Sequence, residues 1–129
     1  MHVRLVRFPA PVARLGWALG TLAAIAAAVA LARDGAVAWW VYPLFLLGPD
    51  LAFLAGIGDT RGLERGQMPP RAVPYYNALH RLEGPAAFAV VAAVALPHLF
   101  LVGAVLWAVH VGGDRALGYG PRTPDGRRG

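Results

Sequence analysis

The sequence predicts an all-α integral membrane protein, a four-helix bundle with both its N and C termini in the cytoplasm. Of its 129 residues, 57% are hydrophobic and only 15% are charged, whereas a soluble domain has about 25% charged residues. Long apolar blocks alternate with short segments that contain most of the arginines. These observations favour the membrane class. The absence of cysteine excludes disulfide scaffolds, thiolate zinc sites and cysteine nucleophiles.

The first predicted span is the uncharged block over residues 15–32, which is just long enough to cross the hydrocarbon core of a bilayer. Residues 1–14 precede it and form the predicted cytoplasmic N-terminal segment. A cleavable signal peptide is the alternative, because Ala30-Leu31-Ala32 resembles a signal-peptidase site. A retained helix is favoured, since the block is long for a signal peptide and further apolar blocks follow it.

The second predicted span covers residues 38–57. It opens with Trp39 and Trp40, an aromatic pair of the kind found at membrane interfaces. Gly48-Pro49-Asp50 interrupts it. Because proline lacks a backbone donor and clashes with the preceding turn, the sequence predicts a kink or a short unwound segment here.

The third apolar region, from Val73 to Leu117, is too long for one span. As a single helix it would extend about 65 Å, roughly twice the hydrocarbon core. Pro97-His98 near its middle offers a turn, so we expect two spans, about 74–96 and 98–117. Residues 15–117 then form one transmembrane domain, and the Gly- and Pro-rich residues 118–129 are predicted to be a flexible basic tail.

The arginines orient these four spans. Every basic residue is arginine, and in this topology ten of the twelve lie on one side of the membrane. The ten are Arg4, Arg7, Arg14, Arg61, Arg65, Arg71, Arg115, Arg122, Arg127 and Arg128. The positive-inside rule makes that side the cytoplasm, which predicts a multi-pass protein of the cytoplasmic membrane. Nucleic-acid binding is not expected, because the arginines lie between apolar blocks rather than along one polar face.

This topology places polar side chains from three spans at one depth, in the cytoplasmic half of the bundle. The four proposed as metal ligands are Asp50, His80, His110 and Asp114. His110 and Asp114 are four residues apart, so they share a helix face. A charge in lipid is unfavourable by about 3 kcal/mol, so this convergence implies mutual pairing, a water-filled pocket or a bound metal. Two imidazoles and two carboxylates suit a divalent cation such as Zn, Mn, Mg or Fe.

Further polar residues of this layer are candidates for catalysis or substrate binding. Asn77 and Glu83 each lie three residues from His80, where Asn77 can orient a substrate and Glu83 can act as a base. Arg115 either binds an anionic headgroup of the substrate or snorkels towards the lipid headgroups. Tyr76 is either a packing or interfacial aromatic or a substrate-binding side chain.

Structural roles are the alternative reading of the same residues. Asp114, at a helix end, can be an ordinary interfacial charge, and Asp50 after Pro49 can satisfy the backbone of a broken helix. Gly112 and Gly113 lack side chains, which predicts that another helix approaches the last span closely at this point.

Four segments together resemble a known family. They are the Trp39-Trp40 pair with PLFLLGPDLAFLAG (43–56), YNALH (76–80), WAVHVGGDR (107–115) and LGYG (117–120). In this order and spacing the chain resembles the bacterial membrane family catalogued as domain of unknown function 4260 over about residues 15–120. The resemblance implies a small multi-pass membrane protein and supplies no activity. The tail after Gly120 departs from the family pattern.

The order Asp50, His80, His110, Asp114 is also similar, more loosely, to that of bacterial membrane-bound metal-dependent hydrolases of the LexA-regulated type. Two functions follow. The first is a metal-dependent, hydrolase-like membrane enzyme acting on a lipid-like or amphipathic substrate. The second is a non-enzymatic membrane module, such as an accessory subunit or a transporter component, in which the same residues form a structural polar network. Four short spans leave little room for a pathway in a monomer, so the second function favours a homo-oligomer.

Overall fold

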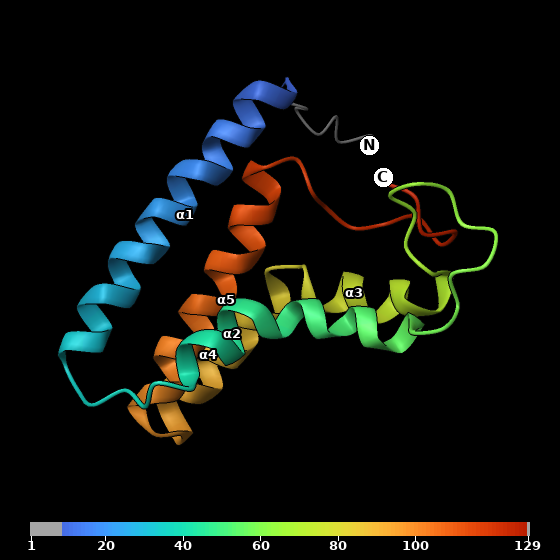
Figure 1. Cartoon of the computed structure of the whole chain (residues 1–129). Helices are drawn as coiled ribbons and strands as arrows, with labels where there is room; N and C mark the ends of the chain where they lie inside the picture. Colours follow the sequence, from blue (N-terminus) through green and yellow to red (C-terminus); the bar gives the residue numbers. More distant parts are fainter. Residues whose placement is uncertain (1–8, 129) are drawn as a thin grey trace, which may run out of the picture.

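The computed structural model describes residues 9–128, and the regular elements in this range are helical apart from one isolated bridge between Arg122 and Arg128. In chain order these are α1 (Ala10–Arg33), α2 (Val41–Leu47), the 3₁₀ helices η1 (Gly48–Gly56) and η2 (Pro70–Ala72), α3 (Val73–Leu79), α4 (Glu83–Ala95) and α5 (His98–Ala116) (Figure 1). The predicted all-α class is confirmed. Arg4 and Arg7, which the predicted orientation uses, lie outside the described residues.

α1 and α5 are long and apolar enough to cross a membrane. They contain 24 and 19 residues, about 36 and 28 Å of helix, against a hydrocarbon core of about 30 Å. The two helices run antiparallel. Arg14 Nε near the start of α1 donates to Ala116 O at the end of α5 over 2.8 Å, and His98 Nε2 at the start of α5 lies 2.6 Å from Leu31 O. Most side chains of α1 are exposed, as expected for an apolar helix in lipid.

The third predicted helix, residues 74–96, is divided in the structure into α3 and α4. The two axes, taken with η2, are bent by 46° at the break between Leu79 and Glu83. Pro85 explains the division, because its ring in a continuous helix would clash with the carbonyl of Arg81. The described residues therefore hold two candidate membrane spans, or three if the bent pair is one span. Apolar helices of this kind indicate a membrane protein.

α2 and η1 form a shorter apolar stretch where the sequence predicts a span over 38–57. The backbone changes from α to 3₁₀ geometry at Gly48, and Pro49 has no N–H with which to continue an α-helical ladder. η1 packs against α3, and the two lie side by side as an arm that projects away from α1 and α5 (Figure 1). The arm has its own core of Ala52, Met68, Ala72, Val73 and Tyr76.

Small residues let the helices approach one another closely. A Cβ added at Gly112 of α5 would overlap the hydroxyl oxygen of Thr21 in α1. At Gly103 it would lie 2.6 Å from the ring of Phe45 in α2. The prediction that a helix approaches the Gly112-Gly113 pair is confirmed for Gly112, whereas a Cβ at Gly113 would meet no atom within 4 Å.

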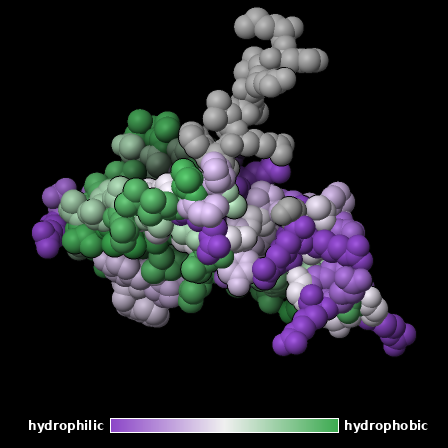
Figure 2. Space-filling model, turned by 90° about the horizontal axis from the view of Figure 1, so that it is seen from above, coloured by the Kyte–Doolittle hydropathy of each residue, from purple (hydrophilic) through white to green (hydrophobic). Residues whose placement is uncertain are grey.

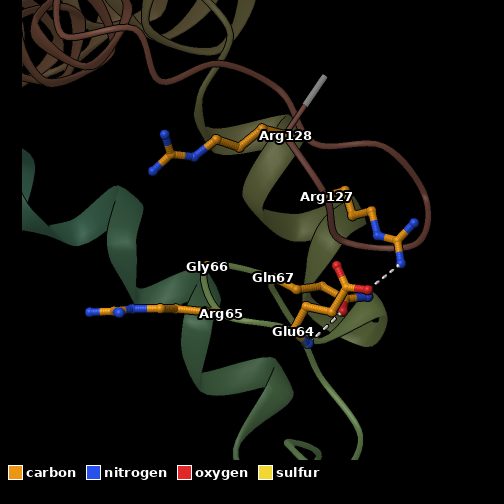
Figure 3. A pocket seen from close by; sticks show the side chains of 6 residues that line it. All are labelled: Glu64, Arg65, Gly66, Gln67, Arg127 and Arg128. Atoms are coloured by element: carbon orange, nitrogen blue, oxygen red, sulfur yellow. Dashed lines mark hydrogen bonds and ion pairs between the residues drawn. The ribbon is translucent and has the colours of Figure 1, made fainter.

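The C-terminal residues fold back onto the loop that precedes η2. Met68 N donates to Gly126 O over 2.9 Å, and Arg127 Nη2 lies 3.1 Å from Glu64 Oε1 (Figure 3). The Thr123 hydroxyl donates to the Asp125 carboxylate, which lowers the pKa of Asp125 below its usual value. The tail and this loop thus share one basic, polar surface beyond the end of the arm.

Candidate metal centre

Four side chains from three helices converge between the arm and α5. They are Asp50 of η1, His80 at the end of α3, and His110 and Asp114 of α5. Each offers one ligand atom, and these four atoms all lie within 4.8 Å of one another. The structure thus brings together the four residues that the sequence places in one polar layer.

The two imidazoles lie at the centre of this cluster. His80 Nε2 is 3.0 Å from His110 Nε2, 3.1 Å from Asp50 Oδ1 and 3.4 Å from Asp114 Oδ2. His110 Nε2 is 3.3 Å from the same two carboxylate oxygens. Two nitrogens and two oxygens therefore enclose one point with a spacing that suits ligands of a single ion.

Local backbone geometry places each of the four candidate ligands. His110 and Asp114 are one turn apart on α5, so both side chains face the arm. His80 ends α3 and is followed by the break that Pro85 imposes. Asp50 lies in the first turn of η1, directly after the change to 3₁₀ geometry. The two interruptions of regular α-helix in this region are therefore the places that supply His80 and Asp50.

Backbone carbonyls fix the tautomer of both histidines. His80 Nδ1 lies 2.8 Å from Tyr76 O, and His110 Nδ1 faces Leu46 O. A carbonyl oxygen only accepts hydrogen bonds, so each Nδ1 carries a proton and donates it. In the neutral rings both Nε2 atoms then present lone pairs to each other and to two carboxylates. Four acceptors aimed at one point require a cation or an extra proton between them, and a carbonyl behind each imidazole is the usual support of a metal-binding histidine.

The cluster is closed on one side and open on the other. The side chains of His80 and His110 are 2% and 8% exposed, whereas those of Asp114 and Asp50 are 28% and 48% exposed. Protein therefore covers the imidazole side, and the Asp50 side is accessible.

Tyr76 lies behind the cluster. Its ring stacks on the His80 ring with centroids 3.8 Å apart and an interplanar angle of 17°, and it is itself buried. Arg122 of the tail lies over the Tyr76 ring, with its guanidinium carbon 5.8 Å from the ring centroid. This position favours packing over direct substrate binding for Tyr76. The sequence gives no signal for the contribution of Arg122, because the contact depends on the fold of the tail.

The remaining candidates lie outside the four-residue group. The amide of Asn77 makes two hydrogen bonds to the backbone of Arg122, of 2.9 and 2.7 Å, and so holds the tail. Glu83 is exposed in the first turn of α4. The Arg115 guanidinium carbon lies 5.2 Å from the centroid of the Trp17 ring in α1, a cation–π contact.

Replacing Asn77 with alanine is expected to release the tail without loss of metal binding. Both hydrogen bonds to Arg122 disappear, at about 1 kcal/mol each, so trypsin should cleave after Arg122 roughly tenfold faster or more. Mass spectrometry of timed digests measures this, with the exposed Tyr75→Ala as control. The predicted flexibility of residues 118–129 is tested at the same time: a parent tail that is cleaved as fast as the variant would show that these bonds do not hold it.

The comparisons with known proteins agree with the sequence resemblance. No curated protein and no solved structure matches the chain. The family model described as domain of unknown function (DUF4260) matches residues 17–128. This range contains all four residues of the cluster, the whole of α5 and all but the first seven residues of α1. The chain belongs to the DUF4260 family.

Proposed function

We propose that this protein is a metal-dependent membrane enzyme, hydrolase-like, acting on a lipid-like or amphipathic substrate in the cytoplasmic half of the membrane. The observation that carries the proposal is the convergence of two imidazole Nε2 atoms, both set by backbone carbonyls, with two carboxylates. The accessible Asp50 side leaves room for a substrate to reach the same point.

The proposed orientation has four membrane-embedded segments and both termini in the cytoplasm. In support, the hydrogen bond from Arg14 to Ala116 O puts the start of α1 beside the end of α5, so basic residues of both lie at one end. The loop and tail add further arginines, and Figure 2 shows most of the strongly hydrophilic residues gathered at one end of the molecule, with a smaller hydrophilic group at the opposite end beyond the hydrophobic residues. Such an asymmetry suits the cytoplasmic face under the positive-inside rule.

The donor set favours some cations over others. Imidazole nitrogens suit Zn, Mn and Fe, and carboxylate oxygens suit Mn and Mg. Two of the four ligands are nitrogens, so Zn, Mn or Fe fit the site better than Mg. When bound, such an ion supplies Lewis-acid activation of water or of a carbonyl or phosphoryl oxygen.

The residues of the chain then have separate tasks. His80 and His110, which are buried and oriented by carbonyls, hold the ion in place. Asp50 is half-exposed and can either ligate or accept a proton from a reacting water. Arg115, held against Trp17, lies next to Asp114 in the sequence and is the candidate for an anionic headgroup.

Metal content tests the proposal directly. The protein is purified in detergent without chelator and without a histidine tag, reloaded with Zn or Mn, and measured by elemental analysis. Near-stoichiometric metal is expected in the parent and in Glu83→Gln, a carboxylate outside the group, with loss of most of it in Asp50→Asn and His80→Ala. A parent that holds no metal after reloading would overturn the proposal. A metal-loaded parent is then assayed on amphipathic esters and phosphoesters with and without EDTA.

A non-enzymatic membrane module is the second candidate, and one observation favours it. Among the described residues, no buried side-chain nitrogen or oxygen lacks a hydrogen-bond partner. A proton on one of the two Nε2 atoms would satisfy the cluster without an ion, as a structural network between the arm and α5. This candidate predicts that substitutions in the cluster destabilise the protein equally with and without metal.

A further inference from the structure

An apolar groove lies beside the metal centre. It has a volume of about 250 Å³ and is lined by α2 and η1 on one side and by Leu79 and Trp107 on the other. Leu44, Gly48 and Leu51 form the α2–η1 side. Leu44 and Leu51 are also exposed on the surface, so the groove opens where a membrane would supply apolar chains.

Residues that line the groove are close neighbours of the cluster residues along the chain, although none of the four cluster residues lines the groove itself. Leu51 follows Asp50, Leu79 precedes His80, and Trp107 lies one helical turn before His110. Each of the three elements that supplies a ligand therefore also supplies a wall of the groove. A molecule in the groove would have its apolar part against these walls and its polar end near the accessible side of Asp50.

The ring of Trp107 forms one wall of the groove, and its neighbours hold it in place. Its indole N–H donates to Leu79 O over 2.8 Å, and Phe88 lies next to it with ring centroids 6.3 Å apart. A Cβ at Gly84 would lie 2.8 Å from the Trp107 ring, so α4 holds the ring in place from behind. Because its only polar atom is already bonded to Leu79, the indole offers the groove an apolar surface.

We infer that the groove binds the single hydrocarbon chain of an amphiphile whose polar head supplies an oxygen to the metal centre. This inference rests on the proposed metal function and names its substrate class as single-chain amphiphiles, such as fatty acids and their esters. Ligand pockets usually have about 300–1,000 Å³, so a groove of 250 Å³ fits one chain rather than the two chains of a bilayer phospholipid. Apolar burial supplies the affinity for the chain, and the metal supplies the position of the head.

A brominated fatty acid tests the inference by quenching the fluorescence of Trp107. The protein carries Trp17→Phe, Trp39→Phe and Trp40→Phe, so that Trp107 is its remaining tryptophan. In detergent, stearate brominated in mid-chain is expected to quench saturably, to be displaced by unbrominated stearate, and to bind more tightly in Zn-loaded protein than in EDTA.

Gly48→Leu in this background is the decisive variant. A Cβ at Gly48 would meet Leu44 Cδ1 at 3.9 Å, an ordinary contact, so a side chain fits there and fills the groove. Affinity for the brominated chain is expected to fall by about tenfold or more, as the loss of a few buried CH₂ groups predicts, while metal content stays at the parent value. Gly20→Leu adds the same side chain to open space on α1 and is the matched control.

The outcomes separate this inference from the proposed function. Quenching that is linear, not displaced, and equal in Gly48→Leu would mean contact with bulk amphiphile and would overturn the groove, whatever the metal content. Saturable binding that Gly48→Leu abolishes, but that Zn and EDTA affect equally, would overturn the link between the head and the metal. Absence of metal from the parent would overturn the proposed function on the same samples.

Discussion

Replacing His110 with alanine is expected to abolish the stabilisation that metal gives to the protein. A ligand that binds only the folded state stabilises it by about 2.7 kcal/mol at 100 times its Kd. His110 supplies one of the two imidazole nitrogens of the proposed metal site, and its Nδ1 faces Leu46 O. Loss of an outer partner alone weakens metal binding by about 10–100-fold, so loss of the ligand should cost more. Thermal unfolding in detergent with Zn and with EDTA measures the effect as the difference between the two Tm values.

His98→Ala is the matched control for this experiment, since it makes the same change at the other end of the same helix. His98 Nε2 bonds to Leu31 O of α1 and lies outside the cluster. The Tm of this variant in EDTA should be lower than that of the parent, because one hydrogen bond is lost. Addition of Zn should still raise its Tm by as much as it raises that of the parent. If His110→Ala kept the parent's Zn-induced shift, the metal would not be bound through this imidazole. If the parent showed no shift and His110→Ala unfolded earlier in both conditions, the structural network would be the better account.

The four members of the cluster could be predicted from the sequence, because helix periodicity and the cost of a charge in lipid place them together. His110 and Asp114 share a helix face by their spacing. Asp50 and His80 follow from the cost of a charge in lipid, which leaves the interior of a bundle as the place for polar side chains. The roles of Tyr76 O and Leu46 O could not be predicted, because every residue has a carbonyl and only the folded backbone aims one at an imidazole.

The sequence contains a residue that predicts the break after His80, but the hydropathy pattern alone does not reveal it. Residues 74–96 are apolar enough to be taken for one helix, and the length of an apolar run is not sensitive to an interruption. A helix tolerates proline only in its first turn, so Pro85 indicates that a new helix begins just before it. The preceding helix must therefore end earlier. The contact of Asn77 with the tail could not be predicted for another reason. Its partner is the backbone of Arg122, 45 residues away, and a contact over that distance depends on the tail's path.

Gly112→Ala is expected to have the second largest effect, through the contact between α1 and α5. A Cβ here would overlap the Thr21 hydroxyl oxygen, which itself donates to Trp17 O over 2.7 Å and so has little freedom to move. Overpacking of this kind costs about 1–3 kcal/mol. Because α1 packs mainly against α5, the two helices should separate at this point. A cross-linking reporter measures this: cysteines that replace Arg14 and Ala116, which lie near each other at one end of the helix pair, should be joined more slowly by a short bismaleimide in the variant than in the same background with Gly112.

Gly113→Ala separates the contact from the helix propensity of the new residue. The two glycines are neighbours in α5, and a Cβ at Gly113 would meet no atom within 4 Å. Alanine there should therefore be neutral or stabilise the helix by up to about 1 kcal/mol, with cross-linking as fast as in the parent. Slower cross-linking in Gly112→Ala alone would locate the close approach of α1 at Thr21. Equal rates in both variants would show that α1 does not pack on this face of α5. Since Asp114 follows directly, metal content measured on the same variants would also show whether α1 helps to hold that ligand in place.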